Sequence, residues 1–359
     1  MLERGYTEGQ HTTRWRSIAL ALVITIAGFL AANALLGRYL DKNGPNLGYR
    51  YVAYKWELLG DSQPVDWLVL GDSTVNQGFD PRHLQRQTGL SALNLGTIGN
   101  FGTIDDLWML EEYLDRHGPP KAVVVVHTYD VWIRRFHRPF LGRIPRTRPL
   151  TRETNRAFKI RRKDRREIAI NRFARLYAER RSLRKSIKFA YLNATRSEEE
   201  MSALRVSDRD LPLKDPVMTA SGYVEMCGAI PEVVRRDYRG HVKHVNKQQF
   251  QLSGDNRRAL KAMMRLADER GFDLYIASGP LYEQLAKKRA FRRYFGELQT
   301  TLRELAGEHA RVHVLDRLKT FPEEQMQNAD HITCDAAPVY TDWLIEQVNS
   351  AQPDAPAKP

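Results

Sequence analysis

The sequence VDWLVLGDSTVNQGFD, at residues 65–80, contains the pattern that decides the fold. Five of the six residues before Gly71 are apolar, and the apolar run ends at Gly71, Asp72 and Ser73. A short apolar run of this kind is typical of a buried strand. The serine that follows belongs either to an ordinary turn, because Gly, Asp and Ser are common turn residues, or to a reactive site at the end of the strand.

Strand and helix patterns alternate along the chain after this stretch. Apolar runs predict further strands at residues 92–95, 122–126, 272–277 and 312–315. Apolar residues at helical spacing predict helices at residues 103–117, 255–270, 291–308 and from 338 onward. Because strands that alternate with helices form parallel sheets with right-handed crossovers, we predict an α/β fold with a doubly wound, mostly parallel sheet.

An apolar segment near the N-terminus predicts a membrane anchor. Residues 17–37 contain no charged side chain, and as a helix they span about 31 Å, which matches the hydrocarbon core of a bilayer. Arg14 and Arg16 precede the segment, which places residues 1–16 in the cytoplasm and the rest of the chain across the inner membrane. Arg38, which follows the segment, argues against this orientation. A cleaved signal peptide and a buried helix are the alternatives.

The rest of the chain divides where its composition changes. The tail is too poor in apolar residues to fold, and the region between the two halves of the α/β pattern shows no regular alternation. We therefore expect a connecting segment at 38–64, an α/β domain in two parts at 65–130 and 254–349, an insertion at 131–253 that is mostly helical in its first half, and a disordered tail at 350–359.

The insertion carries most of the positive charge. Residues 131–195 contain 21 Lys and Arg against four acidic residues, whereas the net charge of the whole chain is +13. A run of charge on helices is usually a solvated face, but an excess of this size favours an anionic partner. Because a domain across the membrane rarely meets nucleic acid, we expect anionic glycans, lipid head groups or an acidic protein instead.

Polar residues follow four of the predicted strands, at the edge of the sheet where ligands bind. Ser73 follows the first strand, and Gly99 and Asn100 follow the second. The sequence HTYD at 127–130 follows the third, and NADHITCDAA at 328–337 follows the last. Four loops are therefore expected to converge on one crevice.

These loops resemble the sequence blocks of the SGNH (GDSL-type) hydrolases and acyltransferases. VLGDS is similar to the first block and implies that Ser73 is the nucleophile. NLGTIGN is similar to the second block and implies that Gly99, with the backbone of Ser73, forms the oxyanion hole. In the last block, His331 takes the place of the catalytic histidine. The resemblance covers about residues 65–130 and 255–348 and implies a flavodoxin-like fold of SGNH type.

The third block, VVVVHTYD, departs from the family pattern. Tyr129 stands where the family has its oxyanion-hole asparagine, and His127 stands where it usually has a glycine. Asn76 and Asn100 are the candidate replacements for the missing donor. Loss of one such donor typically raises a reaction barrier by about 2.7–4 kcal/mol, so the departure predicts a slow enzyme or a replacement group.

The last block also departs, because Asn328 lies three residues before the histidine, where the family has an acid. Asp330 is the nearest acid, and the alternatives are that it orients His331, that Asn328 does so, or that a dyad acts alone. A serine hydroxyl becomes a good nucleophile only when a base accepts its proton. Histidine suits that role because its ordinary pKa is close to neutral.

The cysteines and the remaining histidines give weaker signals. Cys227 and Cys334 form one disulfide if the domain lies in an oxidising compartment, or remain two unrelated buried thiols. His241 and His244 form an H-x-x-H pair without further ligands nearby, and we expect both to be solvated surface residues. Neither a metal nor a cofactor is expected.

The resemblance implies a function at the cell envelope. Members of the family with one N-terminal anchor acylate or deacylate cell-surface polysaccharides, often beside a multi-span membrane acyltransferase that supplies the acyl group. The sequence therefore predicts a membrane-anchored, periplasmic serine esterase or O-acyltransferase that acts on acetyl groups of an exopolysaccharide. The alternatives are a catalytically weak or inactive glycan-binding scaffold subunit, supported by the departures in the third and fourth blocks, and a hydrolase that acts on lipids.

Overall fold

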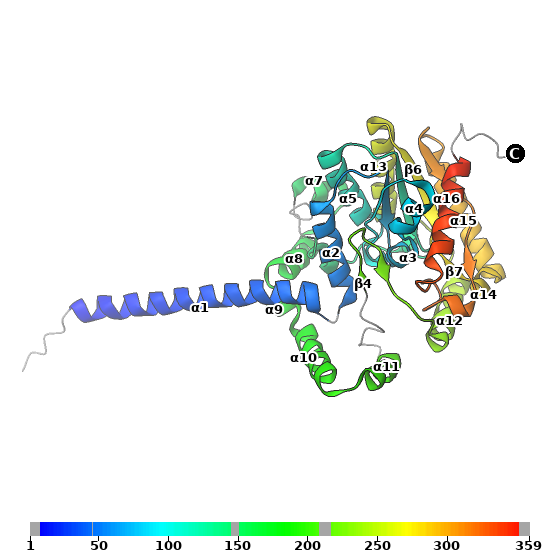
Figure 1. The fold of residues 1–359 in the computed structure, drawn as a ribbon. Helices are drawn as coiled ribbons and strands as arrows, with labels where there is room; N and C mark the ends of the chain where they lie inside the picture. Colours follow the sequence, from blue (N-terminus) through cyan, green and yellow to red (C-terminus); the bar gives the residue numbers. More distant parts are fainter. Residues whose placement is uncertain (1–7, 45, 145–150, 208–216, 352–359) are drawn as a thin grey trace, which may run out of the picture.

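A five-stranded parallel sheet forms the centre of the molecule (Figure 1). The computed structural model describes residues 8–44, 46–144, 151–207 and 217–351. The strands, in their order across the sheet, are β2 (Ala92–Asn94), β1 (Trp67–Gly71), β3 (Ala122–His127), β6 (Asp273–Ser278) and β8 (Val312–Val314). This is the flavodoxin-like order, so the predicted α/β fold with a doubly wound sheet is confirmed.

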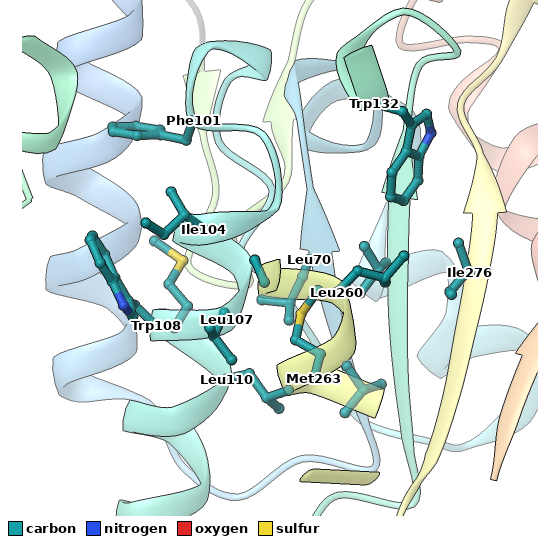
Figure 2. Close-up of a cluster of buried hydrophobic side chains, with 14 of the residues drawn as sticks. Leu70, Phe101, Ile104, Leu107, Trp108, Leu110, Trp132, Leu260, Met263 and Ile276 are labelled. Atoms are coloured by element: carbon teal, nitrogen blue, oxygen red, sulfur yellow. The ribbon is translucent and has the colours of Figure 1, made fainter. Parts of the chain in front are cut away.

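Helices cover both faces of the sheet. Leu68 and Leu70 of β1 belong to the core beneath α5 (Thr103–His117), α13 (Gly254–Arg270) and α15 (Arg289–Ala306). Figure 2 shows Leu70 among side chains of α5 and α13. Trp67 and Val69 face the opposite core, formed with α3 (Ser73–Gly78), α4 (Pro81–Thr88) and α16 (Ala337–Ala351). Successive side chains of a strand point to opposite faces, so a continuous apolar run fits a sheet covered on both sides.

Gly71 ends β1 in a conformation that requires glycine. Its φ is +139°, and a Cβ atom there would lie 1.9 Å from the carbonyl oxygen of Val126 on the neighbouring strand. Only glycine adopts this backbone region without strain and leaves room for the adjacent strand. The chain therefore turns sharply from strand into helix α3, which places Ser73 at the carboxyl end of the sheet.

We expect Gly71→Ala to lower the free energy of unfolding by about 3 kcal/mol or more, because it adds a backbone clash to an unfavourable φ. Denaturant unfolding of the detergent-solubilised chain measures this. Gly89→Ala is the matched control, because Gly89 has φ +74° with nothing within 4 Å of the added Cβ, and it should cost only about 1–2 kcal/mol. Equal losses in the two variants would contradict the steric argument.

The N-terminal apolar segment forms one long helix, α1 (Glu8–Asn43), which projects from the domain (Figure 1). Among the described residues, it is the one helix long and apolar enough to cross a membrane, although a signal sequence would meet the same criteria. Most of its apolar side chains are exposed, Leu22 and Ile24 by about 60% each. The alternative of a helix buried in a soluble domain therefore does not fit this structure.

Residues 38–64, expected to be a connecting segment, contain a helix that the sequence analysis did not predict. Helix α2 (Leu47–Asp61) buries Val52, Trp56 and Leu59 in the core. Its Lys55 is fully buried and donates to the backbone carbonyl oxygens of Asn94, at 2.7 Å, and Gly222. Burial lowers the pKa of this lysine well below its ordinary value. The segment is therefore part of the domain.

Between β3 and β6, the described residues form mostly helices. Short strands β4 (Val217–Met218) and β5 (Val224–Glu225) form an antiparallel pair, and β7 (Leu281–Tyr282) pairs in parallel with β9 (Thr320–Phe321). The remaining helices are α6 (Arg138–Leu141), α7 (Arg152–Ala157), α8 (Arg162–Phe173), α9 (Arg175–Ala178), α10 (Arg180–Thr195), α11 (Glu198–Ser207), α12 (Pro231–Lys247) and α14 (Glu283–Ala286). The predicted disordered tail at 350–359 lies outside the described residues except for its first two residues, which end α16.

Candidate active site

Ser73 is the first residue of α3 and lies directly beyond β1, half-buried. The residue before it, Asp72, is fully buried and fixes this turn. Its carboxylate accepts hydrogen bonds from the backbone N–H of Thr74 and Thr128, both at 2.8 Å, and from the hydroxyl of Thr74 at 2.6 Å. Asp72 therefore joins the loops that follow β1 and β3, and it holds Ser73 at the point where these loops diverge.

His331 lies in the loop between β9 and α16, and two neighbours contact its ring. Its Nδ1 is 2.6 Å from Oδ1 of Asp330 and 2.9 Å from Oδ1 of Asn328. The same Asn328 oxygen accepts the backbone N–H groups of Asp330 and His331, at 3.0 and 2.8 Å. This tight turn, closed by an asparagine side chain, brings Asp330 round to its own neighbour, which an extended segment would not do.

The charge of Asp330 decides the chemistry of the His331 ring. Burial lowers the pKa of His331, but the charge of Asp330 and its hydrogen bond to the ring raise it further, so the net shift is upward. Burial raises the pKa of Asp330, and the pairing with His331 lowers it well below its ordinary value. Because Nδ1 carries the proton donated to Asp330, neutral His331 has its lone pair on Nε2, where a general base needs it.

The loop of His331 packs against the helix that begins with Ser73, and Arg134 lies next to Gly99. The charge of Asp72, next to Ser73, contributes to raising the pKa of His331. Gly78 of α3 lies against the loop of His331, since a Cβ on it would be 3.7 Å from the side chain of Ile332. Arg134, in turn, would be 2.8 Å from a Cβ on Gly99. Burial lowers the pKa of Arg134, but the carboxylate of Asp130, followed by those of Asp72 and Asp330, raises it, so the net shift is upward.

The two candidate asparagines differ in their surroundings. Asn100 is exposed. Asn76 is fully buried, one turn after Ser73 on α3, and both polar atoms of its side chain lack a hydrogen-bond partner among the described residues. A buried amide without a partner is costly, so Asn76 is the better candidate for a group that binds charge developing on a substrate.

The hydroxyl of Tyr129 is engaged by another side chain of the protein. The hydroxyl is 2.7 Å from Nδ1 of His241 on α12, and the ring packs edge-on against Phe291 and Tyr294 of α15. A tyrosine at this position therefore supports the packing of α12 and α15 against the end of β3.

His127 has a structural role that the sequence did not indicate. Its side chain is fully buried, with Nε2 2.7 Å from Asp106 of α5 and Nδ1 3.5 Å from Asp72. Burial lowers the pKa of His127, but the two carboxylates raise it to about 9. A protonated His127 therefore lies between two carboxylates, hydrogen-bonded to Asp106 and 3.5 Å from Asp72, which fixes the Ser73 turn.

We expect the free energy of unfolding to fall as the pH rises from about 6.5 to about 9, because His127 loses its proton over this range. The ordinary pKa of histidine, 6.5, is the value for the unfolded chain, and the folded value is about 9. The folded state thus holds the proton more tightly. The contribution is complete below about pH 6.5 and is lost by about pH 9, on the order of 3 kcal/mol. Denaturant unfolding of wild type and His127→Gln at both pH values measures this.

Comparison of the two proteins isolates the contribution of His127. His241 also has its pKa raised to about 9, but it is present in both proteins, so its pH dependence cancels in the difference. The fall in the free energy of unfolding between the two pH values should be smaller in His127→Gln than in wild type. Parallel pH dependences in wild type and variant would contradict a charged His127 in the folded state.

His241 is a second histidine at the site, and its predicted position on the solvated surface is wrong. Its side chain is only 11% exposed, and its Nε2 is 3.3 Å from Asp237. His244, also expected at the surface, is half-buried against the rings of Tyr129 and Tyr294. On α12, the buried Val234 lies seven residues before His241 and the buried Val245 four residues after it. This helical spacing is the signal that could have revealed the buried face.

Asp237, His241 and Asp330 could together hold a metal ion, because one ligand atom from each lies within 4.8 Å of the others. The three side chains already have partners within the protein. His241 pairs with Tyr129 and Asp237, while Asp330 pairs with His331. Their arrangement extends the site from the Asp330–His331 pair toward α12.

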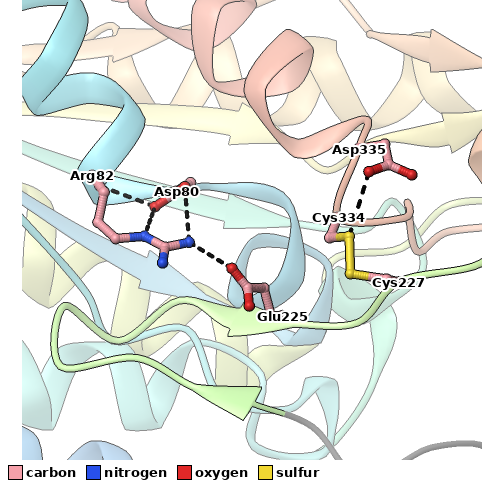
Figure 3. The surroundings of a disulfide bond; sticks show 6 residues. All are labelled: Asp80, Arg82, Glu225, Cys227, Cys334 and Asp335. Atoms are coloured by element: carbon pink, nitrogen blue, oxygen red, sulfur yellow. Dashed lines mark hydrogen bonds and ion pairs between the residues drawn. A yellow bond between two sulfur atoms is a disulfide. The ribbon is translucent and has the colours of Figure 1, made fainter.

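Cys227 and Cys334 form a disulfide, which resolves the two alternatives (Figure 3). Cys334 lies three residues after His331, and its backbone N–H donates to the carbonyl oxygen of Met226 at 2.9 Å. Beside the disulfide, Arg82 of α4 bonds to Glu225 of β5 at 2.8 Å. The loop of His331 is thus fastened to β5, and β5 to the helix that follows α3.

Comparisons with known proteins add little to this geometry. No protein-family model matches the chain, and no curated protein matches it. A solved structure described as "a putative platelet activating factor from Streptococcus pneumonia" aligns with a TM-score of 0.36 and 13% sequence identity, over 88% of this chain and 97% of that chain. A likeness this distant carries no argument about function.

Proposed function

We propose that the chain is a serine esterase or O-acyltransferase of SGNH type that forms an acyl-serine on Ser73. The observation that carries the proposal is the Asp330–His331 pair, with 2.6 Å between Oδ1 and Nδ1, in a loop that packs against the helix beginning with Ser73. The Gly-Asp-Ser turn after β1, Gly99 in the loop after β2 and the histidine before the last helix support it, because they follow the order of the family's sequence blocks.

The proposed reaction has two halves. In the first, Oγ of Ser73 attacks the carbonyl carbon of an acetyl ester while Nε2 of His331 accepts the serine proton. The backbone N–H groups of Ser73 and Gly99, with the amide of Asn76, stabilise the oxyanion. Collapse of the intermediate breaks the ester bond, and His331 returns the proton to the departing alcohol. In the second half, water or a sugar hydroxyl attacks the acetyl-serine by the same route.

The anchor and the disulfide support a location at the cell envelope. Disulfides persist in oxidising compartments such as the periplasm, and α1 has the length and composition of a membrane span. We therefore propose a periplasmic domain held at the inner membrane, with a cell-surface polysaccharide as acceptor or substrate. A multi-span membrane acyltransferase is the proposed acyl donor, and nucleic acid is not a proposed partner.

Trapping the acyl-enzyme tests the proposal. The full chain in detergent is incubated with p-nitrophenyl acetate, quenched in acid and digested with trypsin. We expect an acetyl group on the peptide that spans residues 56–82, with fragmentation placing it on Ser73, and we expect de-O-acetylated polysaccharide to remove it before quenching. An acetyl group confined to other peptides would contradict the proposed nucleophile.

A scaffold function is the second candidate, because the Tyr129 hydroxyl is engaged by His241 and the family's asparagine donor is missing. A scaffold would bind the polysaccharide without forming an acyl-enzyme. Isothermal titration of the polysaccharide into Ser73→Ala/His331→Ala distinguishes the two. Undiminished binding, with no acetyl-serine in wild type, would favour the scaffold.

A further inference from the structure

A cavity of about 740 Å³ lies where α1 meets the domain, away from the candidate active site. It is bounded by the end of α1, by α2, by residues 142–144 after α6, and by the end of α8 with the start of α9. Four arginines line it: Arg38, Arg143, Arg172 and Arg175. Figure 1 shows α8 and α9 on the side of the domain from which α1 projects.

Arg143 is the most informative of these residues. Its side chain is only 2% exposed; Nη2 donates to Glu179, and the guanidinium lies 4.3 Å from the ring centre of Tyr49. Its Nε and Nη1 are buried and have no hydrogen-bond partner among the described residues. Buried N–H donors on a cation are costly to leave unpaired, so these two donors indicate an acceptor that enters the cavity.

The charges around the cavity leave a positive excess. Arg175 pairs with Asp41 and also donates to the carbonyl oxygen of Gly37, at 3.2 Å. Glu57, the other acid that lines the cavity, is 3.6 Å from Lys42. Burial and the nearby charge of Arg175 lower the pKa of Arg143 despite the charge of Glu179. The cavity is therefore suited to an anion.

The cavity lies just after the stretch of α1 whose apolar side chains are exposed. Asn33 of α1 is buried: its amide donates to the carbonyl oxygen of Phe173, and its Oδ1 accepts the N–H of Leu176, both at 2.9 Å. Before Asn33, the apolar side chains of α1 are exposed over a length suited to lipid. Arg38 lies about 8 Å beyond Asn33 along the helix axis. If α1 spans the bilayer, this places Arg38 at the depth of the head groups.

Aromatic side chains next to the cavity fit the same depth. Phe173 and Tyr177 are 63% and 57% exposed, and the guanidinium of Arg180 lies 4.3 Å from the ring centre of Tyr177. Exposed aromatic rings accompanied by basic residues are typical of the membrane–water interface. The surface around the cavity is thus suited to contact with head groups.

We propose that this cavity binds the phosphate head group of an anionic membrane lipid, with Arg143 as its central ligand. The proposal rests on the membrane anchor of the proposed function, but not on the catalytic role of Ser73. Arginine suits phosphate because its planar, forked donors match the phosphate oxygens. Bound in this way, one lipid would fix the domain against the membrane surface at the base of α1.

Native mass spectrometry of the full chain tests this. The protein is released from mixed micelles that contain equal amounts of phosphatidylglycerol and phosphatidylcholine. We expect one phosphatidylglycerol to remain bound in preference to phosphatidylcholine, and Arg143→Gln to reduce that retention about tenfold, because a charge-assisted hydrogen bond is lost. Arg162→Gln/Arg166→Gln is the matched control, since both side chains are exposed on α8 and do not line the cavity.

Further variants separate folding and catalysis from lipid binding. Arg38→Gln changes an exposed residue of the cavity and should also reduce retention, so the test does not depend on the folding of Arg143→Gln, which circular dichroism checks. Ser73→Ala should retain the lipid, whether or not wild type is an esterase. The proposal would be overturned if Arg143→Gln and Arg38→Gln retained as much phosphatidylglycerol as wild type. It would also be overturned if the control Arg162→Gln/Arg166→Gln lost as much of the lipid as they do. Inorganic phosphate is added in a further measurement. If it displaced the bound lipid, and the protein showed no preference between the two lipids, the cavity would bind a free anion and the lipid proposal would be wrong.

Discussion

Ser73→Ala is expected to abolish the hydrolysis of p-nitrophenyl acetate, with kcat/KM falling by about 10⁴-fold or more. The reason is that the variant lacks the oxygen of the proposed acyl-enzyme, while the backbone donors of the proposed oxyanion hole remain. The measurement is the release of p-nitrophenol by the full chain in detergent, in parallel with labelling by a fluorescent serine-directed phosphonate. Both signals should disappear together, because they report the same hydroxyl.

Ser278→Ala is the matched control. Ser278 ends β6 at the same edge of the sheet and is buried, so its replacement perturbs the same region without removing the proposed nucleophile. It should retain both hydrolysis and labelling. If Ser73→Ala kept full activity, the Gly-Asp-Ser turn would be an ordinary turn, and the acyl-serine mechanism would have to be abandoned.

The sequence predicts the sheet well because its strands are continuous apolar runs and its helices have regular spacing. Helix α5 has the predicted bounds of 103–117, and β3 extends the predicted 122–126 by one residue. The right-handed crossover rule limits the ways in which these elements can be connected. Helix α2 was missed because its apolar residues lie among charged ones, and because Lys55 is buried through contacts with residues distant in the sequence.

The candidate site is only partly accessible to sequence reasoning. The carboxyl ends of parallel strands share an edge, so the sequence predicts that the loops of Ser73, Gly99 and His331 lie near one another. The partners of the two histidines could not be predicted. Asp330 reaches His331 only because Asn328 closes a tight turn, and His241 reaches Tyr129 only because α12 packs against α15. Contacts of this kind depend on loop conformation and on packing between distant segments.

Replacement of Asp330 should separate the roles of the two neighbours of His331. In Asp330→Asn, the ring loses the carboxylate that holds its tautomer and stabilises its charged form, so kcat should fall by about 10²–10⁴-fold. The pH profile should move as well. Because the charge of Asp330 raises the pKa of His331, its removal lowers that pKa. The acid limb of kcat/KM should therefore shift to lower pH while the plateau falls, which a pH–rate series with p-nitrophenyl acetate records.

Asn328→Ala is the matching test of the turn. Asn328 contacts the same Nδ1 at 2.9 Å, but its oxygen also accepts two backbone N–H groups, so its main effect is to hold the loop. We expect kcat to fall about tenfold, in line with one neutral hydrogen-bond network. The acid limb of kcat/KM should stay near its wild-type position, because the carboxylate of Asp330 remains. A larger loss in Asn328→Ala than in Asp330→Asn would reverse the assignment. The asparagine, at the family's position for the acid, would then orient the base, and the adjacent carboxylate would serve only to balance the charge of His241.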